Sequence, residues 1–597
     1  MDRQSVLGYV LIFLLLVVWM WMSSPRSTQQ GGQPKASPSQ TTQPDTLKHA
    51  EARPAQAAVP TSVEPLGKFF AGRDKGRDQT VTIETDRFVA ELSTKGGVVK
   101  SWELKKFKTW DGNPVQLVDY KKGGDLSLLF ETSDGRLINT HDLYFDLAPG
   151  QSRALTVQGD EECSATFILP TAAGGYISKT LRFKNGEYGL SVDVKFVKMA
   201  DVVANFEYQF IWESGLRYAE RNSIDESNFS EAYAYAGKEL TEVDATSVDT
   251  KQEKNISGTV DWVATRTKYF ALAIIPKGTG SDGAYLEGTR AAAPDKGVVE
   301  SYSIGLKMPF KGSAEENGSF QIFFGPADLS LLKSYGIGLD NIVGLGWTWL
   351  IRPISEYIML PTMMFIHYLV PNWGLVIIVF SIIIKIVLHP LTRSSMRSMK
   401  KMQALQPLMN EIKEKYKDDP QKMNQQVMNL YKEYGVNPAG GCLPLLLQFP
   451  ILIALYNVFR ATIELRQGSF VWWITDLSIP DRIFTLPFEI PLFGVRDVSG
   501  LALLMGITMF VQQKMTVKDP RQKAMIWMMP VMMTLLFNSF PSGLNLYYFV
   551  FNVLSIGQQI IINRQSDGEP LRKVEPKRKK PSGIFAKIGK DLPRLKK

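Results

Sequence analysis

Six apolar stretches and one long alternating region make up the pattern of hydrophobic and polar positions along this 597-residue chain. The apolar stretches are long enough, or nearly so, to cross a hydrocarbon layer as helices. They are Val6–Met22, Asn372–Pro390, Leu443–Phe459, Gly500–Gln513, Ala524–Phe540 and Leu544–Ile562. Between the first two, residues 68–330 alternate as half-buried strands do. The pattern predicts an α-helical polytopic membrane protein with six transmembrane helices and a separate all-β domain.

The alternating region carries the turn signals of antiparallel strands. "TVTIETDRFVAELS" (80–93) alternates on both sides of a short polar break, and Asn185-Gly186 separates two alternating runs, which is the commonest hairpin signal. Many short strands with turns between them are typical of a sandwich of sheets. No catalytic constellation is visible, so we interpret the domain as one that binds or shields something, with an enzyme as the alternative.

Three flanking segments have a different character. We predict an uncleaved N-terminal transmembrane anchor over 1–22, because no small-residue cleavage site follows the apolar run. Residues 23–67 are rich in Ser, Thr, Gln and Pro, which favours a disordered tether. Residues 346–370 are apolar but broken by Pro353 and Pro361, which indicates an interfacial amphipathic helix region over 331–371; an early start of the next span is the alternative.

The charge is concentrated at the C-terminus. Residues 564–597 hold twelve Lys and Arg against four Asp and Glu, a net of +8 out of +9 for the chain. Residues 393–432 are also basic, and basic segments stay on the cytoplasmic side. We therefore expect both termini in the cytoplasm and the β domain outside. The basic tail can attract anionic lipids or ribosomal RNA phosphates, so both are expected partners.

The segment 392–435 is predicted to form a cytoplasmic helical hairpin. Apolar residues recur every three or four positions on each side of a break at Asp418-Asp419-Pro420. Among them are Met396, Met399, Met402, Met409 and Met423. Either the two stripes pack on each other, or the flexible methionines receive apolar partners.

Lys385 lies inside the apolar stretch "VIIVFSIIIKIVLHPL" (376–391). A lysine there costs roughly 2.5–3.5 kcal/mol on insertion scales. The side chain could snorkel across about five residues, roughly 7 Å, to the headgroups. Polar residues in several of the stretches favour instead a shared polar groove, whose predicted members are Lys385, Ser381, Gln448, Tyr547 and Tyr548.

Two of the stretches are short and rich in methionine. Gly500–Gln513 and Ala524–Phe540 would form roughly 21–26 Å of helix against a hydrocarbon core near 30 Å, so we expect the bilayer to thin beside them. Their methionines would make an adaptable surface for another helix. The predicted contacts are Met505, Met509, Met525, Met528, Met529 and Met532.

The sequence offers few residues suited to metal binding or catalysis. The chain has two cysteines, Cys163 and Cys442, and four histidines without ligand spacing, so we expect no metal, no cofactor and no catalytic residue. A secondary transporter or channel is the alternative function, although no internal repeat is evident. An intramembrane protease built on Ser542 lacks the G-x-S-x-G context.

The chain from about Gly346 to Asn563 carries a dense, ordered set of family motifs. They are "NWGLVIIVFSIIIKIVLHPLT", "KMQALQP", "YKEYGVNPAGGCLPLLLQFPILIALYNVF", "ELRQGSF", "WITDLS", "KDPRQKAM" and "FPSGLNLYYFVFN". This part resembles the YidC membrane insertases of the wider Oxa family, in the Gram-negative form with a large periplasmic domain. Over 68–325 the resemblance rests on position and β character.

The resemblance implies a five-helix insertase core over 372–563 and a periplasmic β-supersandwich. The core would enclose a hydrophilic groove, open to cytoplasm and lipid, that inserts nascent inner-membrane proteins without hydrolysing ATP. The family's groove charge is usually an arginine; Lys385 keeps the charge but not the planar five-donor fork. Ser381, Gln448 and Tyr548 align with other groove positions. Expected partners are nascent membrane proteins and the Sec translocon, with the protein acting as a monomer.

Overall fold

The computed structural model describes residues 66–121, 125–294, 297–436, 443–490, 494–516, 523–565 and 573; for 443–447, 523, 525 and 565 it describes the backbone alone. These residues divide into two compact units, with the boundary between Gly344 and Leu345. The predicted anchor (1–22) lies outside the described residues, as do nearly all of the tether (23–67) and the basic tail (564–597).

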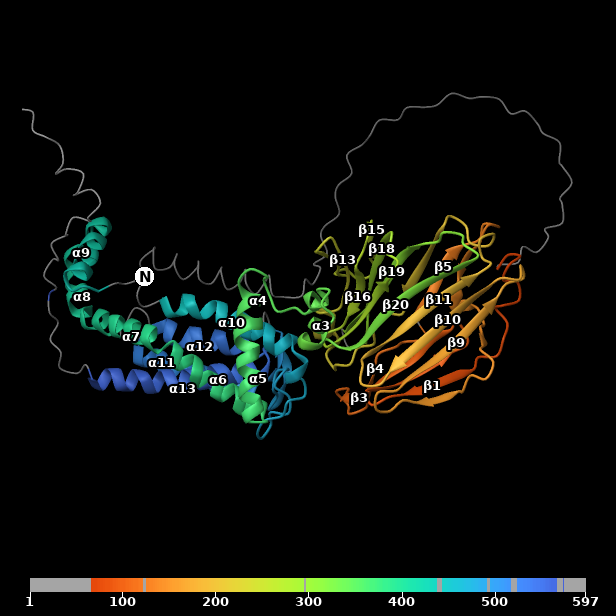
Figure 1. Ribbon diagram of the computed structural model, residues 1–597. Coiled ribbons are helices and arrows are strands. Elements are labelled where there is room, and N and C mark those ends of the chain that lie inside the picture. The colour runs from red at the N-terminus through yellow and green to blue at the C-terminus, as the bar shows by residue number, and fades with distance from the viewer. Residues whose placement is uncertain are drawn as a thin grey trace, which may run out of the picture. The chain divides into compact units, whose positions relative to one another are not determined.

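The first unit is built from three sheets and a few short helical turns (Figure 1). The five-stranded sheet has the order β4 (Pro114–Gln116), β3 (Val98–Lys108), β2 (Phe88–Ser93), β1 (Thr80–Glu84) and β8 (Ala154–Thr156). The nine-stranded sheet has the order β14 (Glu239–Val243), β13 (Glu231–Ala236), β16 (Trp262–Arg266), β17 (Phe270–Lys277), β20 (Glu315–Pro326), β11 (Gly189–Val197), β10 (Tyr176–Lys184), β9 (Glu162–Pro170) and β7 (Asp146–Leu147). The six-stranded sheet has the order β15 (Gln252–Ser257), β18 (Gly283–Ala292), β19 (Val298–Pro309), β12 (Glu207–Trp212), β5 (Asp125–Glu131) and β6 (Leu137–Asn139). The helical turns are η1 (Thr140–Asp142) and α2 (Ser223–Ser227).

Aromatic side chains join the sheets. Phe210 of the six-stranded sheet stacks on Phe320 of the nine-stranded sheet, with ring centroids 4.1 Å apart. Trp102 of the five-stranded sheet stacks on Phe324 at 4.9 Å. Burying large rings between sheets is the main favourable contribution to such a core. The prediction of a β-rich domain is confirmed, and so is the hairpin at Asn185-Gly186, which joins β10 to β11.

A buried lysine connects all three sheets. Lys179 of β10 is fully buried, and its ammonium donates to the carbonyl oxygens of Gly96 (3.1 Å), Gly97 (3.0 Å) and Leu126 (2.7 Å). Burial lowers the pKa of Lys179 to about 7. Because Gly96 and Gly97 lie between β2 and β3 and Leu126 lies on β5, one side chain joins segments of three separate sheets.

Residues 331–344 belong to this β unit and not with the helices that follow. They contain most of α3 (Leu329–Ser334) and all of η2 (Leu339–Ile342). The Trp262 indole donates to the Ile337 carbonyl at 3.0 Å, and Arg266 donates to the Ile342 carbonyl. Sequence periodicity placed this segment in a separate interfacial region, 331–371, because it could not register these contacts with strands far away in the chain.

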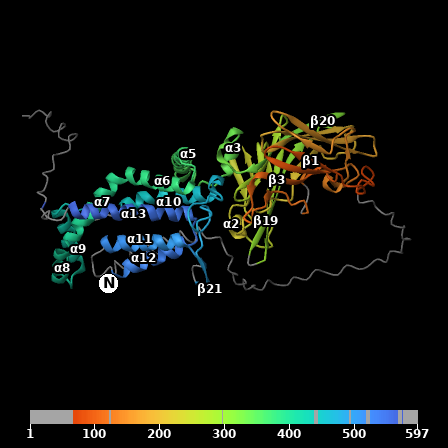
Figure 2. The ribbon, with the colours of Figure 1, turned by 90° about the horizontal axis from the view of Figure 1, so that it is seen from below.

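The second unit is a helical bundle (Figure 1). Its helices are α4 (Ile351–Pro353), the π-helix η3 (Ile354–Met359), α5 (Leu360–Leu369), α6 (Trp373–Val387), α7 (His389–Ala404), α8 (Gln406–Lys415), α9 (Pro420–Glu433), α10 (Leu443–Ala461), η5 (Ile463–Leu465), α11 (Gly500–Thr516), α12 (Lys523–Phe537) and α13 (Ser542–Gln565). A two-stranded ribbon, β21 (Phe484–Ile490) and β22 (Val495–Val498), precedes α11. In Figure 2, α13 lies between α6 and α11, and it contacts both.

These helices differ in whether their length and apolar composition would allow them to span a membrane. Among the described residues, Ser542–Arg564 is long and apolar enough to span a membrane, and α6 with α7 would count as a second span if the pair, bent by 64°, is taken as one. Ile526–Phe537 is apolar but shorter. The count of six spans therefore stays a prediction.

Prolines set the breaks along the helices that lead out of the bundle. Pro390 cannot donate a backbone hydrogen bond, and the chain bends at this point between α6 and α7. Pro407 lies in the first turn of α8, and Leu405 forms the junction between α7 and α8. The first arm of the predicted hairpin is consequently two helices that begin at His389, not one that begins near 392.

The buried Glu226 predicts how the stability of the β unit depends on pH. Its carboxyl accepts the backbone N–H groups of Ala219 (3.0 Å) and Glu220 (2.8 Å), and burial raises its pKa from 4.5 to about 8. The folded state thus binds this proton more tightly than the unfolded state, so the stabilisation is complete below pH 4.5 and is lost as pH rises through 8.

We expect Glu226→Gln to remove this dependence. Urea unfolding of residues 66–344 at pH 5 to 8 should show the wild type losing stability relative to Glu226→Gln by at most about 1.4 kcal/mol per pH unit. Glu239→Gln, at an exposed glutamate, is the control and should follow the wild type. Parallel curves for Glu226→Gln and the wild type would contradict the assignment.

Candidate functional site

Lys385 points into the interface between α6 and α13. Its side chain is buried, with 7% of the residue exposed, and its ammonium donates to the Ser555 hydroxyl of α13 at 2.6 Å. The same ammonium lies 4.5 Å from the centre of the Phe551 ring. No carboxylate of the described residues forms an ion pair with it. The cation is therefore held by a neutral hydroxyl and an aromatic face, and its charge is not cancelled.

Ser381 lies one turn from Lys385 but is not hydrogen-bonded to it. Its buried hydroxyl donates to the Ile377 carbonyl of its own helix at 2.7 Å. A serine that bonds back to the preceding turn adds a small polar surface without leaving a donor unsatisfied. Near it, Phe380 and Tyr547 bring α6 against α13, with ring centroids 6.3 Å apart.

The other predicted groove residues form a second polar contact, between α10 and α13. Gln448 of α10 hydrogen-bonds to Tyr548 of α13. Tyr547 is fully buried, and its hydroxyl has no hydrogen-bond partner within the part of the chain that the structure describes. Such a group usually has a water or a ligand as its partner. The structure thus places the five predicted residues on α6, α10 and α13: Lys385 bonds to Ser555, Gln448 bonds to Tyr548, Ser381 bonds within its own helix, and the Tyr547 hydroxyl has no partner among the described residues.

Four polar residues that the sequence did not assign to the groove extend the site toward the end of α13. The Gln558 amide lies 3.3 Å from both His389 Nδ1 and the Thr392 hydroxyl of α7. Ser555 lies one turn before Gln558 and faces Lys385. We call Lys385, Ser555, Gln558, His389 and Thr392 the polar seam. The signal was present in the sequence: Asn552, Ser555 and Gln558 recur every three residues of an otherwise apolar helix.

The methionines of α11 and α12 are only partly available. Met505 is buried, Met509, Met529 and Met532 are half-buried, and Met528 is 59% exposed; the side chain of Met525 lies outside the described residues. α11 approaches α12 closely, because a Cβ on Gly506 would lie 2.0 Å from the Thr534 hydroxyl. Large exposed apolar side chains cover the outside of this pair: Ile507, Trp527, Met528 and Val531.

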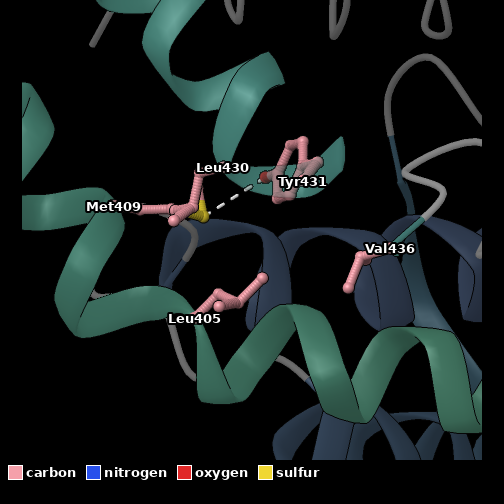
Figure 3. Close-up of a cluster of buried hydrophobic side chains, with 5 residues drawn as sticks. All are labelled: Leu405, Met409, Leu430, Tyr431 and Val436. Carbon is pink, nitrogen blue, oxygen red and sulfur yellow. Dashed lines mark hydrogen bonds between the residues drawn. The ribbon is translucent and has the colours of Figure 1, made fainter. Parts of the chain in front are cut away.

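The hairpin formed by α7, α8 and α9 has a small core of its own (Figure 3). Leu405, Met409, Leu430, Tyr431 and Val436 are buried together, and the Tyr431 hydroxyl donates to the Met409 sulfur at 3.2 Å. Met402 packs against this cluster. The two apolar stripes therefore pack on each other, whereas Met396, Met399 and Met423 are half-buried and lie outside the cluster.

No metal centre is evident among the described residues, which hold no group of three or more His, Cys, Asp and Glu suited to a cation. The fold and the site together define a helical membrane protein with a β-rich domain, in which a cation is buried between helices.

Two family models match this chain. The "YidC periplasmic domain" matches residues 80–356, and the "60Kd inner membrane protein" matches residues 365–569.

Curated relatives cover nearly the whole chain. The protein named membrane protein insertase YidC of Chlorobaculum parvum is 41% identical over 567 residues, 94% of each chain. Its namesake in Chlorobaculum tepidum is 39% identical over 568 residues, 94% of this chain and 95% of that one. A crystal structure described as an active YidC insertase with its first transmembrane domain resolved covers 83% of this chain, at 20% identity and a TM-score of 0.34.

The chain therefore belongs to the YidC family of membrane protein insertases. This confirms the family inferred from the sequence motifs, together with the expectation that the protein is not an enzyme, and it does not favour the transporter alternative. The family is one of inner-membrane proteins with a periplasmic domain, as predicted.

The contact between Lys385 and Ser555 generates a prediction about stability. Ser555→Ala removes the hydroxyl that solvates the ammonium, and a hydrogen bond to a charged group contributes about 1.5–3 kcal/mol. We expect a lower thermal unfolding midpoint in detergent for Ser555→Ala, and a smaller change for Ser555→Thr, which keeps the hydroxyl.

A double-mutant cycle provides the control. In a Lys385→Met background there is no ammonium to solvate, so Ser555→Ala should cost clearly less than in the wild type. An equal loss in both backgrounds would mean that Ser555 acts through packing alone.

Proposed function

We propose that this protein inserts nascent membrane proteins by letting a polar segment of the client pass along the polar seam and the neighbouring Gln448–Tyr548 contact. The observation that carries the proposal is the burial of Lys385 without a carboxylate partner among the described residues. A cation in such a place attracts an acidic or polar segment, and the hydroxyl and amide groups around it can replace part of the segment's hydration shell.

The energetic argument concerns the barrier to crossing. A polar segment in hydrocarbon leaves each of its polar groups unsatisfied, at several kcal/mol each. A polar path that extends part of the way, beside a bilayer thinned by short helices such as α12 (Lys523–Phe537), lowers that barrier. The apolar segment that follows then leaves sideways into lipid, which supplies the driving force. The protein's own residues need no covalent chemistry for this step.

The proposed topology has six spans. α6, α10, α11, α12 and α13 would be five of them and Val6–Met22 the sixth, with both termini in the cytoplasm and the β unit in the periplasm. The direction of the helices supports this arrangement: α7, α8 and α9 follow the end of α6 that carries Lys385, and the Lys400 ammonium donates to the carbonyl of Asn563 near the end of α13 at 2.8 Å. These basic elements would then share the cytoplasmic side.

The exposed apolar side chains of α11 and α12 are the proposed contacts for the client's hydrophobic segment. Met528, at 59% exposed, and the half-buried Met509, Met529 and Met532 can adapt to different partners. In the hairpin, this role is restricted to Met396, Met399 and Met423, because Met402 and Met409 belong to its own core.

Substitution of Lys385 tests the proposed role of the charge. Lys385→Arg should preserve insertion, Lys385→Met should slow it, and Lys385→Glu should slow it most, by about tenfold for clients with acidic translocated segments, equivalent to ~1.4 kcal/mol of barrier. The measurement is protease protection of a single-span client in proteoliposomes, with acidic and neutral versions of its translocated segment.

The matched control is Lys401→Glu, which reverses a charge on the exposed side of α7 and should leave insertion unchanged. Equal insertion of both clients by the wild type, Lys385→Met and Lys385→Glu would remove Lys385 from the mechanism and leave snorkelling as the reason for its presence.

Further partners are proposed from charge. The basic tail, 564–597 with a net of +8, would hold translating ribosomes near the seam, with anionic lipid as the competing partner. Cooperation with the Sec translocon and action as a monomer belong to the same proposal.

Ribosome binding by the tail can be measured directly. Full-length and tail-truncated protein in neutral detergent should differ in co-sedimentation with ribosomes at low salt, and the difference should shrink as salt rises, because each neutralised phosphate releases counterions. If both forms sediment equally at low salt, the tail is not the ribosome contact. Binding that depends on added anionic lipid would favour the competing partner.

A further inference from the structure

The ribbon formed by β21 and β22 presents apolar side chains that stay exposed in the described part of the helical unit. Phe484 is 50% exposed and Phe488 is 62% exposed. Phe484 pairs with Val498, whereas the next pair, Thr485 and Asp497, is joined by a hydrogen bond between the side chains at 2.5 Å. Successive residues of a strand point to opposite faces, so this end of the ribbon has an apolar pair on one face and a polar pair on the other. The register shifts between Thr485 and Ile490, so Phe488 is assigned to the apolar surface by its exposure and not by alternation.

The connection to α11 places this ribbon at a definite level. β22 ends at Val498 and α11 begins at Gly500, so the pair Phe484–Val498 lies two residues, roughly 7 Å of extended chain, from the helix start. The polar layer on each side of a bilayer's hydrocarbon core is about 5–8 Å thick. If α11 spans the membrane, the ribbon therefore starts within the headgroup layer.

Neighbouring aromatic and buried polar groups mark the same level. Trp472 is 85% exposed and stacks on Trp473, with centroids 5.8 Å apart. The Trp473 indole donates to Asp481 at 2.7 Å, and Asp481 in turn accepts the backbone N–H of Gly500 at 2.8 Å. The two tryptophans are thus fixed to the first turn of α11. Tryptophan is enriched at this depth of a membrane because its ring is apolar and its N–H is polar.

The direction and charge of the ribbon fit the same environment. In Figure 2, β21 projects to the side of the bundle, across the direction of α11 and α12. Arg482, just before β21, and Arg496 of β22 are both exposed. The Arg482 guanidinium lies 3.8 Å from the exposed Asp497 carboxylate, and a lipid phosphate would compete with this contact, because guanidinium groups pair well with phosphodiesters.

We propose that the β21–β22 ribbon lies in the outer phospholipid headgroup layer, with Phe484 and Phe488 directed toward the acyl chains and Arg482 and Arg496 toward lipid phosphates. It would anchor the end of α11 at the membrane surface. The inference rests on the proposed assignment of α11 as a membrane span, and not on the role of the polar seam.

Fluorescence quenching tests this placement in the full-length protein. Single cysteines at Phe484→Cys, Phe488→Cys and Glu489→Cys, in a chain carrying Cys163→Ser and Cys442→Ser, are labelled with an environment-sensitive nitrobenzoxadiazole dye. The protein is reconstituted into vesicles of phosphatidylcholine and phosphatidylglycerol. Lipids with a nitroxide near the headgroup and iodide in the outer solution serve as the two quenchers, and Ile507→Cys, on the exposed side of α11, reports whether that helix is in the bilayer.

We expect dyes at 484 and 488 to be blue-shifted and quenched by the nitroxide lipid, and the dye at 489 to be quenched mainly by iodide. Iodide quenching at all three positions would overturn the inference, as would protection from both quenchers at 484 and 488, which would mean that protein covers them. Absence of lipid quenching at 507 would instead contradict the proposed span, so the two failures are distinguishable.

Discussion

An ammonium buried among apolar helices has to be solvated by the protein itself, and this constraint organises the helical unit. The solution at Lys385 is a serine hydroxyl at 2.6 Å and the face of Phe551, both from α13. A carboxylate would have stabilised the cation more strongly, but it would also have cancelled the charge. A neutral partner leaves the site electropositive, as the proposed passage of an acidic or polar client segment would require.

The same constraint recurs in the β unit, with a different outcome. Lys179 is fully buried, and three backbone carbonyl oxygens accept from its ammonium. Those carbonyls belong to segments of two other sheets. All three N–H groups of the ammonium therefore have acceptors, and the side chain joins the sheets. At Lys385 a single side-chain hydroxyl is the acceptor, and the nearby Tyr547 hydroxyl has no partner among the described residues. Both lysines are buried. The polar seam lies beside a hydroxyl that can still accept or donate a hydrogen bond, whereas the site of Lys179 has no such group among the acceptors of its ammonium.

Prolines and polar side chains together shape the region where the seam ends. Pro390 bends the chain by 64° between α6 and α7, and the bend brings His389 and Thr392 to Gln558 of α13. The hairpin beyond this point buries only a small core of its own, and contacts such as the bond from Lys400 to Asn563 attach it to the bundle. The free energy of local unfolding is therefore expected to be lower for this hairpin than for the packed helices.

The sequence by itself determined the β character of the first unit, the apolar helices of the second, the Asn185-Gly186 hairpin and the position of a charged Lys385 in an apolar stretch. Each of these features depends on local periodicity or on the polarity of a single residue among its neighbours in the chain. Only the tertiary structure decided which partners these elements have. The pairing of Lys385 with Ser555, 170 positions away, the attachment of 331–344 to the β unit, and the exposure of Phe488 all depend on which surfaces meet. Periodicity reports the face that a side chain occupies but carries no information on the distant element that packs against it, and for that reason the seam had to be read from the fold.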